Sequence, residues 1–313
     1  MDWFTKEGRD LPWRRQPRAY AVVVSEFMLQ QTQVTTVLPY YKAWLKQFPD
    51  WRRLAEAEEQ AVMAAWEGLG YYSRARNLHR LAGVVMEVFE GDFPNDPAVI
   101  RQLPGIGDYT AGAIASFAFN QAEPAVDGNV ARVMARLLDW RAPIDQPATM
   151  QALREVAGTL IPPNGARMFN GGLMELGALI CGPREPLCML CPVRDFCQAT
   201  EPATLPVKQP RRKTVHLTER CWFVLESGRL ALAPGMRAKR WRGLWRLPDC
   251  ADMLAEPLDE EPFPYTHHRI VLQVIAGTRR DLPEAIEWVR LEDLKRYPLP
   301  APHRRLLDRL LEE

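Results

Sequence analysis

The spacing of apolar side chains changes once along this chain, and the change restricts its fold more than any other feature. From the first residues to about residue 200, apolar positions recur every three or four residues, which is the period of an α-helix. Turn signals rich in Gly, Pro and Asp separate these segments. Helices are predicted over residues 18–31, 34–47, 58–67, 73–90, 97–102, 108–118, 128–138, 148–160 and 166–180.

A second, smaller domain is predicted beyond residue 218, where the spacing shortens to that of β-strands. CWFVLESGRLALA predicts two short strands around Ser227 and Gly228, RIVLQVIAG predicts another, and a helix is expected over about residues 301–312. The stretch before these strands combines prolines with basic residues and is expected to be extended. The predicted parts are a helical region at 1–200, a linker at 201–218 and an α/β domain at 219–313.

The length and charge of the chain restrict its partners and its location. With 313 residues it can build two hydrophobic cores, and its formal charge of +1 creates no overall field that would indicate a nucleic-acid or membrane partner. No apolar run reaches the ~18 residues needed to span a bilayer, and MDWFTKEGRD lacks the order of a secretory signal. We therefore expect a cytoplasmic protein.

One carboxylate, Glu26, lies inside the almost continuously apolar stretch AYAVVVSEFMLQQTQ, residues 19–33. A helix that is apolar on nearly all sides packs inside a domain, so Glu26 is not expected to be freely solvated. Because burying an ionised carboxylate without a partner is costly, such a residue finds a partner or keeps its proton. A retained proton would suit an acid catalyst.

A second carboxylate, Asp127, directly precedes Gly128 and a clear helical pattern. Its default role is an N-cap that accepts bonds from the free amides of the first helical turn. A carboxylate beside the positive end of a helix is also held ionised. Glu26 as an acid and Asp127 as an anion would form the kind of pair that cleaves glycosidic bonds.

The segment LPGIGDYTAGAIASFAF, residues 103–119, places a tight Pro-Gly-Ile-Gly turn between two helices. Glycine permits positive φ and close approach. Gly105 and Gly107 can therefore bring the first backbone amides of the second helix to a phosphate. A packing corner between two helices is the alternative, and the turn alone does not decide.

Four cysteines in the loop CGPREPLCMLCPVRDFC have the spacing C-x6-C-x2-C-x5-C, and they are Cys181, Cys188, Cys191 and Cys197. Four thiolates in one short loop suit a tetrahedral zinc ion or a [4Fe-4S] cluster, and the spacing does not choose between them. Cys221 and Cys250 stand apart from this group. The pattern indicates a metal site in a reducing compartment rather than a disulfide framework.

Six motifs in this order resemble the MutY family of adenine DNA glycosylases: LPWR, SEFMLQQTQV, WEGLGYYSRARNLH, LPGIGDYTAG, VDGNVARV and the four-cysteine loop. The helical core and the loop are shared with endonuclease III and the wider helix-hairpin-helix superfamily, whereas SEFMLQQTQ and GLGYYSR favour MutY. The resemblance implies a mainly α, two-lobed helix-hairpin-helix core with a [4Fe-4S] cluster and a small Nudix-like α/β domain. It also implies a bacterial, nucleoid-associated monomer.

The family acts in base excision repair on double-stranded DNA, where it flips adenine mispaired with 8-oxoguanine or guanine and cuts its bond to deoxyribose. By resemblance, Glu26 would protonate adenine N7 and Asp127 would stabilise the oxocarbenium ion or its covalent adduct. Asn129 and Tyr109 would order the site. The residues implied to contact bases are Arg14 and Glu175 in the adenine pocket, Gln31, Leu69 and Tyr71 in the stack around 8-oxoguanine, and Thr266 and His267 in the C-terminal domain.

Two positions refine the activity that the resemblance implies. Relatives that also nick DNA carry a nucleophilic Lys where this chain has Tyr109, so a monofunctional enzyme is expected. In the C-terminal domain, Tyr265, Thr266 and His267 stand where the family has Phe-Ser-His, which alters the expected contact with 8-oxoguanine. The adjacent His267 and His268 also allow a metal site, although no cysteine or acidic residue at a suitable spacing supports one.

Two alternative functions stay open at this point. A related glycosylase of the same superfamily would act on thymine mismatches or oxidised pyrimidines. A non-catalytic DNA-binding iron-sulfur protein would keep the fold and the cysteine loop, but it would not need Glu26 and Asp127 together.

Overall fold

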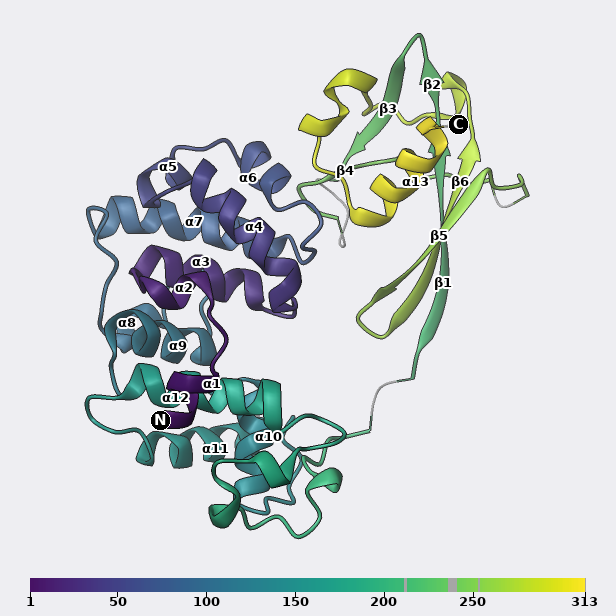
Figure 1. Cartoon of the computed structure of the whole chain (residues 1–313). Helices are drawn as coiled ribbons and strands as arrows, with labels where there is room; N and C mark the ends of the chain where they lie inside the picture. Colours follow the sequence, from purple (N-terminus) through teal and green to yellow (C-terminus); the bar gives the residue numbers. More distant parts are fainter. Residues whose placement is uncertain (211–212, 236–240, 253, 313) are drawn as a thin grey trace. The chain divides into compact units, whose positions relative to one another are not determined.

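A computed structural model describes residues 1–210, 213–235, 241–252 and 254–312, and they form two compact units (Figure 1). The first unit comprises Met1–Ala55 and Asn77–Pro210, and the second comprises Glu56–Arg76 with Arg211–Glu313. The segment Glu56–Arg76 thus groups with the C-terminal residues, although the sequence pattern includes it in the helical region. The predicted division at residues 200 and 218 stays a prediction.

Helices build the first unit. They are α1 (Asp2–Glu7), α2 (Pro12–Arg15), α3 (Ala19–Leu29), α4 (Val34–Gln47), α5 (Trp51–Ala55), α8 (Pro97–Ile100), α9 (Asp108–Phe119), α10 (Gly128–Leu137), α11 (Pro147–Thr159) and α12 (Ala166–Glu175). α7 (Ser73–Val88) begins in the second unit, and a π-helical turn, Leu176–Ile180, extends α12. Every helix predicted for this region is present within a few residues, so the mainly α prediction is confirmed. None of the described helices is long and apolar enough to cross a membrane.

The core of the first unit forms around α3, which contacts α4 and α9. Val23, Val24, Phe27 and Met28 on α3 are fully buried, as expected for a helix that is apolar on nearly all sides. A second cluster joins α10 to α11 through buried side chains that include Val130, Met134, Leu153 and Ala157. α10 and α9 each also contact α12. These contacts fix the ends of α3, α9 and α10 relative to one another.

The second unit combines α6 (Glu59–Ala65) with an α/β domain. Its strands are β1 (Val215–Phe223), β2 (Leu225–Glu226), β3 (Arg229–Pro234), β4 (Trp245–Arg246), β5 (Asp259–Tyr265), β6 (His268–Ala276) and β7 (Glu287–Arg290), and its long helix is α13 (Ala301–Glu312). The small α/β domain is therefore confirmed. The first residues of β1 lie in the predicted linker, which is a difference from the expectation, whereas Arg211 and Arg212 of that linker lie outside the described residues.

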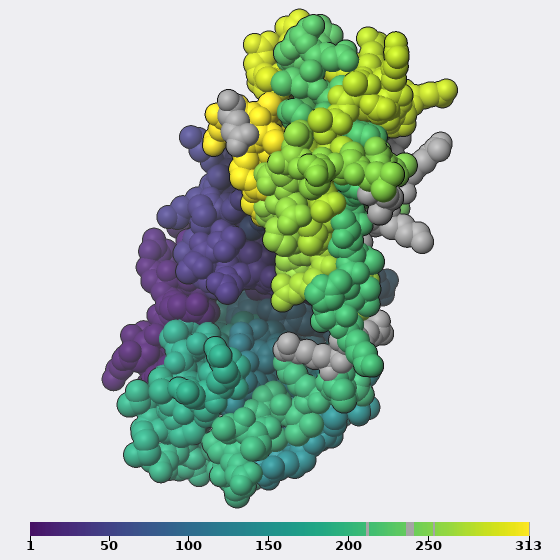
Figure 2. Space-filling view, turned by 90° about the vertical axis from the view of Figure 1, so that its right-hand side faces the viewer, coloured from purple at the N-terminus to yellow at the C-terminus, as the bar shows by residue number. Residues whose placement is uncertain are grey.

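Two small sheets form the α/β domain. In one, β6 lies between β1, to which it is parallel, and β5, to which it is antiparallel. In the other, β3 pairs with β2, β4 and β7, all antiparallel. α13, yellow in Figure 2, packs against β5 and β6, and Leu306 and Leu307 on this helix are fully buried. The domain thus has a core of its own.

A glycine at position 112 is needed for the contact of α9 with the chain that precedes α10. A Cβ atom at Gly112 would lie 2.2 Å from the carbonyl oxygen of Pro124, so this backbone contact cannot accept a side chain. We expect Gly112→Ala to lower the free energy of unfolding by about 1–3 kcal/mol. Gly83→Ala in α7 is the matched control, because nothing lies within 4 Å of its Cβ position. Urea unfolding followed by circular dichroism measures both, and equal stability of the two variants would contradict this packing.

Candidate active site

A cavity of about 1150 Å³ in the first unit is lined by residues of α3, α9, α10 and α12 and by the chain around α2. Its volume exceeds the ~300–1,000 Å³ of most small-molecule sites, so it has room for more than a single ring system. Most of the predicted site residues of this unit line it: Arg14, Glu26, Gln31, Gly105, Gly107, Tyr109, Asp127 and Asn129. The fold therefore brings together residues that lie as much as 115 positions apart in the sequence.

The Glu26 carboxyl is buried at the wall of this cavity, with 4% of the residue exposed. One of its oxygens accepts a hydrogen bond of 2.8 Å from the Tyr109 hydroxyl. Burial raises the pKa of Glu26 from 4.5 to about 7, and the nearby Asp127 contributes to the rise, while the Tyr109 bond opposes it. Burial and these two carboxyl groups also raise the pKa of Tyr109 well above 10, so the phenol stays a donor.

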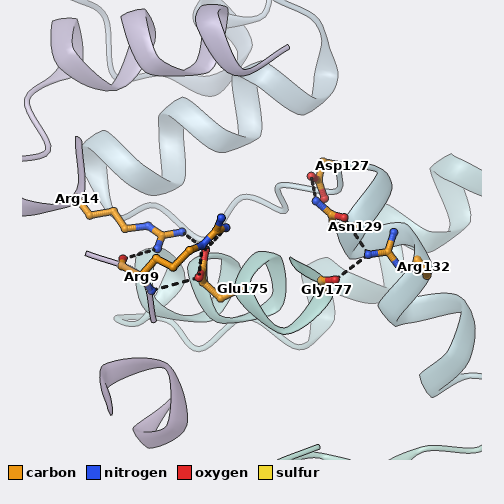
Figure 3. Close-up of polar contacts among 7 residues, drawn as sticks. All are labelled: Arg9, Arg14, Asp127, Asn129, Arg132, Glu175 and Gly177. Atoms are coloured by element: carbon orange, nitrogen blue, oxygen red, sulfur yellow. Dashed lines mark hydrogen bonds and ion pairs between the residues drawn. The ribbon is translucent and has the colours of Figure 1, made fainter. Parts of the chain in front are cut away.

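Asp127 caps the start of α10, as its place in the sequence predicts. Its Oδ1 accepts a bond of 2.7 Å from the Val130 amide, and its Oδ2 accepts one of 3.2 Å from the Asn129 side chain. Asn129 Oδ1 accepts in turn from Arg132, at 2.9 Å, and Arg132 also donates to the Gly177 carbonyl oxygen at 2.7 Å. Figure 3 shows the bonds that link Asp127, Asn129, Arg132 and Gly177.

The two carboxyl groups differ in how strongly they hold a proton. Burial raises the pKa of Asp127 above 3.8, but bonds from the Val130 and Asn129 amides oppose the rise. The cavity thus pairs Glu26, whose pKa is raised to about 7, with a carboxyl group whose hydrogen bonds favour its anion, which is the arrangement of an acid beside an anion.

Glu175 lies behind the cavity wall and is held by two arginines, as Figure 3 shows. Its side chain is fully buried and accepts bonds of 2.7 Å from Arg9 and 2.9 Å from Arg14, both of which line the cavity. Burial alone would raise the pKa of Glu175, but these two arginines outweigh it and lower the pKa below 4.5. The sequence interpretation missed Arg9, and no local pattern in the sequence marks it as a partner of Glu175.

The turn before α9 has the geometry that its glycines predict. Gly105 has a φ of +76°, and a Cβ atom there would lie 2.6 Å from that of Asn77, so a larger residue is excluded. Gly107 is the N-cap of α9 and provides no side chain to bond the first amides of the helix. These amides stay available to an anion. The Asp108 carboxylate beside them is bonded to Arg101 and Arg154, which reduces its repulsion of a phosphate.

The four thiols of the cysteine loop line a second cavity, of about 40 Å³. Burial raises the pKa of Cys191, and the other three thiols raise it further, as expected for groups that face one another. Arg136, buried in the loop, donates to the Cys181 sulfur at 3.2 Å and to the Gly182 carbonyl oxygen at 2.7 Å. The loop therefore gathers four thiols at one small cavity, and the Arg136 guanidinium bonds one of them.

Zinc and an iron-sulfur cluster place different requirements on four thiols. Among the described residues, no group of three or more His, Cys, Asp or Glu side chains is arranged to hold a metal ion, and this includes the adjacent His267 and His268. A single tetrahedral zinc with Zn–S bonds of ~2.3 Å needs its thiolates within roughly 4 Å of one another. A [4Fe-4S] cluster also takes four thiolates, with iron and sulfide between them.

The remaining predicted site residues belong to the second unit. Tyr71 is half-exposed, with a φ of +47°, whereas Leu69 is only 5% exposed. Thr266, with a φ of +53°, and His267 form the turn between β5 and β6. The Thr266 hydroxyl donates to the Tyr265 carbonyl oxygen at 2.7 Å. The structure thus presents Tyr71 and the Thr266 turn at the surface of this unit and buries Leu69.

The proteins to which this chain is similar are DNA glycosylases. The model of the HhH-GPD superfamily of base excision DNA repair proteins matches residues 24–158. Human adenine DNA glycosylase is 47% identical over 210 residues, which are 64% of this chain but only 38% of the human protein. The adenine DNA glycosylase of Buchnera aphidicola subsp. Schizaphis graminum is 33% identical over 80% of this chain and 73% of its own length. A solved thermostable thymine-DNA glycosylase is 30% identical to this chain, with a TM-score of 0.59. The match covers 64% of this chain and 92% of that protein.

Glu175 should stabilise the fold only while it is ionised. We expect Glu175→Gln to lower the free energy of unfolding at pH 7 by about 1–3 kcal/mol, because two arginines lose their anionic partner. Since the folded state lowers the pKa of this group, its contribution is present above pH 4.5 and is lost as pH falls through the lower, folded value. Urea unfolding at pH 7 and pH 4 should therefore show a smaller difference between wild type and variant at pH 4.

Glu155→Gln is the control for this experiment, because Glu155 is an exposed glutamate of α11. It should change stability little at either pH. A Glu175→Gln protein as stable as wild type at pH 7 would contradict the assigned ion pairs.

Proposed function

The chain belongs to the adenine DNA glycosylases, within the HhH-GPD superfamily of base excision repair proteins, and from this we propose that it excises mispaired adenine from double-stranded DNA. The substrate we propose is adenine opposite 8-oxoguanine or guanine. One observation carries the proposal: Glu26 and Asp127 face one cavity, and only Glu26 has its pKa raised to about 7. A binding protein without catalysis has no need for this pair.

Glu26 acts as the general acid in the proposed reaction. Its proton goes to N7 of the flipped adenine, which turns the base into a neutral leaving group as the bond to the sugar breaks. The Tyr109 hydroxyl, 2.8 Å from the Glu26 carboxyl, orients that group and supports its anion after transfer. The raised pKa keeps a large share of Glu26 protonated at neutral pH, where an unperturbed glutamate would have lost its proton.

Asp127 acts on the sugar. As the bond to adenine breaks, positive charge develops on the deoxyribose ring, and the Asp127 carboxylate stabilises it as an ion pair or as a covalent adduct. The bonds from Val130 and Asn129 favour the ionised form of this carboxylate and fix its direction. Asn129 is itself held by Arg132. The anion is thus in place before the charge develops.

The other residues bind the DNA. Arg14 and Glu175, with Arg9, shape the pocket for adenine, because their ion pairs fix donors and acceptors at its wall. Backbone amides beyond Gly105 and Gly107 bind a phosphate. Gln31, Leu69 and Tyr71 contact the base stack around 8-oxoguanine. Thr266 and His267 contact 8-oxoguanine.

We also propose that Cys181, Cys188, Cys191 and Cys197 hold a [4Fe-4S] cluster. The four thiols line one small cavity, and the resemblance of their loop to that of the MutY family supports a cluster over zinc. A bound cluster would cross-link the loop through four iron-thiolate bonds. The hydrogen bond from Arg136 to the Cys181 sulfur would stabilise the thiolate and its orientation.

Single-turnover cleavage of defined duplexes tests the proposed function. Wild type should form abasic sites from adenine opposite 8-oxoguanine and opposite guanine, but not from adenine opposite thymine. Glu26→Gln should reduce the rate by about 10²–10⁴-fold, because the amide has no proton to give. The wild-type rate should fall above about pH 7 as Glu26 ionises. The residual rate of the variant should not fall in this pH range.

Two further arms separate the alternatives. Cleavage of thymine or oxidised-pyrimidine duplexes, with adenine duplexes left intact, would assign the related glycosylase activity. Borohydride should trap little protein on the DNA, since Tyr109 cannot form a Schiff base. Strong trapping would contradict a monofunctional enzyme, and full activity of Glu26→Gln would remove Glu26 from the mechanism.

A further inference from the structure

The turn between α6 and α7 has a backbone conformation that needs support. Gly68, Gly70 and Tyr71 have φ values of +98°, +69° and +47°, so three residues within four positions occupy the left-handed region. For the two glycines this conformation is accessible, but for a tyrosine it is rare. Tyr71 is also 49% exposed. A strained, exposed aromatic side chain of this kind persists only where its surroundings hold the backbone.

Contacts within the segment hold the carbonyl groups of the turn. Arg74, 5% exposed, donates to the carbonyl oxygens of Leu69 and Gly70 at 2.9 and 3.0 Å. The Trp66 indole donates to the same Gly70 oxygen at 3.1 Å. The Arg74 guanidinium also lies 5.7 Å from the centre of the Tyr71 ring. These bonds hold the inner side of the turn.

The two ends are held by the C-terminal residues of the same unit. Before the turn, Glu67 accepts two bonds from Arg304 of α13, at 2.6 and 3.2 Å, and both side chains are about one-fifth exposed. After the turn, the buried hydroxyl of Tyr72 donates to the Leu299 carbonyl oxygen at 3.0 Å. Arg304 is itself oriented by a bond of 3.0 Å to the Tyr297 carbonyl oxygen. Residues of the α/β domain therefore bracket the turn that carries Tyr71.

We propose that Arg304 is a positioning residue for DNA: through Glu67 it fixes the strained turn so that Tyr71 is preset to enter the base stack. This inference rests on the proposed function, because it assigns Tyr71 a contact with DNA. Pre-organisation removes the cost of ordering the turn at the moment when adenine leaves the helix. The domain proposed to contact 8-oxoguanine would thereby also favour the extrusion of the opposite adenine.

Arg305 provides a matched control on the same helix. It is the next residue of α13 and also forms a close ion pair, with Glu261 at 2.5 Å, but that pair lies on β5 and does not touch the turn. Arg305→Gln and Arg304→Gln remove the same charge from the same helix. Only Arg304→Gln should affect the turn.

Hydrogen exchange of the full-length protein without DNA tests whether the Glu67–Arg304 ion pair, called the clamp below, holds the turn. Amides of residues 66–74 should exchange several-fold faster in Glu67→Gln and in Arg304→Gln than in wild type, and at the wild-type rate in Arg305→Gln. The exchanged pair Glu67→Arg with Arg304→Glu should restore most of the protection. Unchanged protection in both single variants would overturn the proposal, whatever the enzyme does to DNA.

Extrusion of the base tests the consequence. A duplex with the fluorescent adenine analogue 2-aminopurine opposite 8-oxoguanine reports unstacking, and Glu67→Gln should slow this step about tenfold. Combined with Tyr71→Ala, the same change should have little further effect, because the clamp acts through Tyr71. An equal slowing in both backgrounds would assign the ion pair to general stability and overturn the proposal. If wild type excises no adenine from any duplex, the proposed function fails, and with it the role of the clamp in extrusion.

Discussion

The burial of one carboxyl group, Glu26, is the constraint on which the site depends. Because α3 is apolar on nearly all sides, it packs at the centre of the first unit, and this position takes Glu26 out of water. The same burial that costs free energy for the ionised form raises the pKa of Glu26 to about 7. The Tyr109 hydroxyl donates a hydrogen bond to the Glu26 carboxyl, and this donor carries no charge. An acid that works at neutral pH thus follows from where the helix packs.

The opposite requirement, a stable anion, is met by the end of a helix. Asp127 caps α10, and bonds from Val130 and Asn129 limit how far burial raises its pKa. The side chains beyond it continue the support, since Arg132 bonds both Asn129 and the Cys181 carbonyl oxygen. The direction of the Asp127 carboxylate is therefore tied to the backbone of the cysteine loop. Two carboxyl groups in one cavity acquire different roles because one packs in a core and the other caps a helix.

Much of this was predictable from the sequence, for local reasons. Apolar periodicity located α3, α9 and α10. Residue type with helix position singled out Glu26 and Asp127, and spacing singled out the four cysteines. What periodicity cannot supply is which side chains far apart in the chain meet. Arg9 was missed because nothing near it in sequence announces a bond to Glu175, 166 positions away. The grouping of Glu56–Arg76 with the C-terminal residues was missed for the same reason, since α6 has an ordinary helical pattern.

A direct titration of Glu26 tests whether its burial raises the pKa of the carboxyl group enough for it to act as the acid. Carboxyl-labelled glutamate followed by ¹³C NMR, with Glu26→Gln used to assign the signal, gives the pKa of this group in the full-length protein. We expect a pKa near 7 in wild type and a higher pKa in Tyr109→Phe, which lacks the bond that lowers it. A wild-type value near 4.5 would show that burial does not hold the proton, and Glu26 could then not serve as the acid.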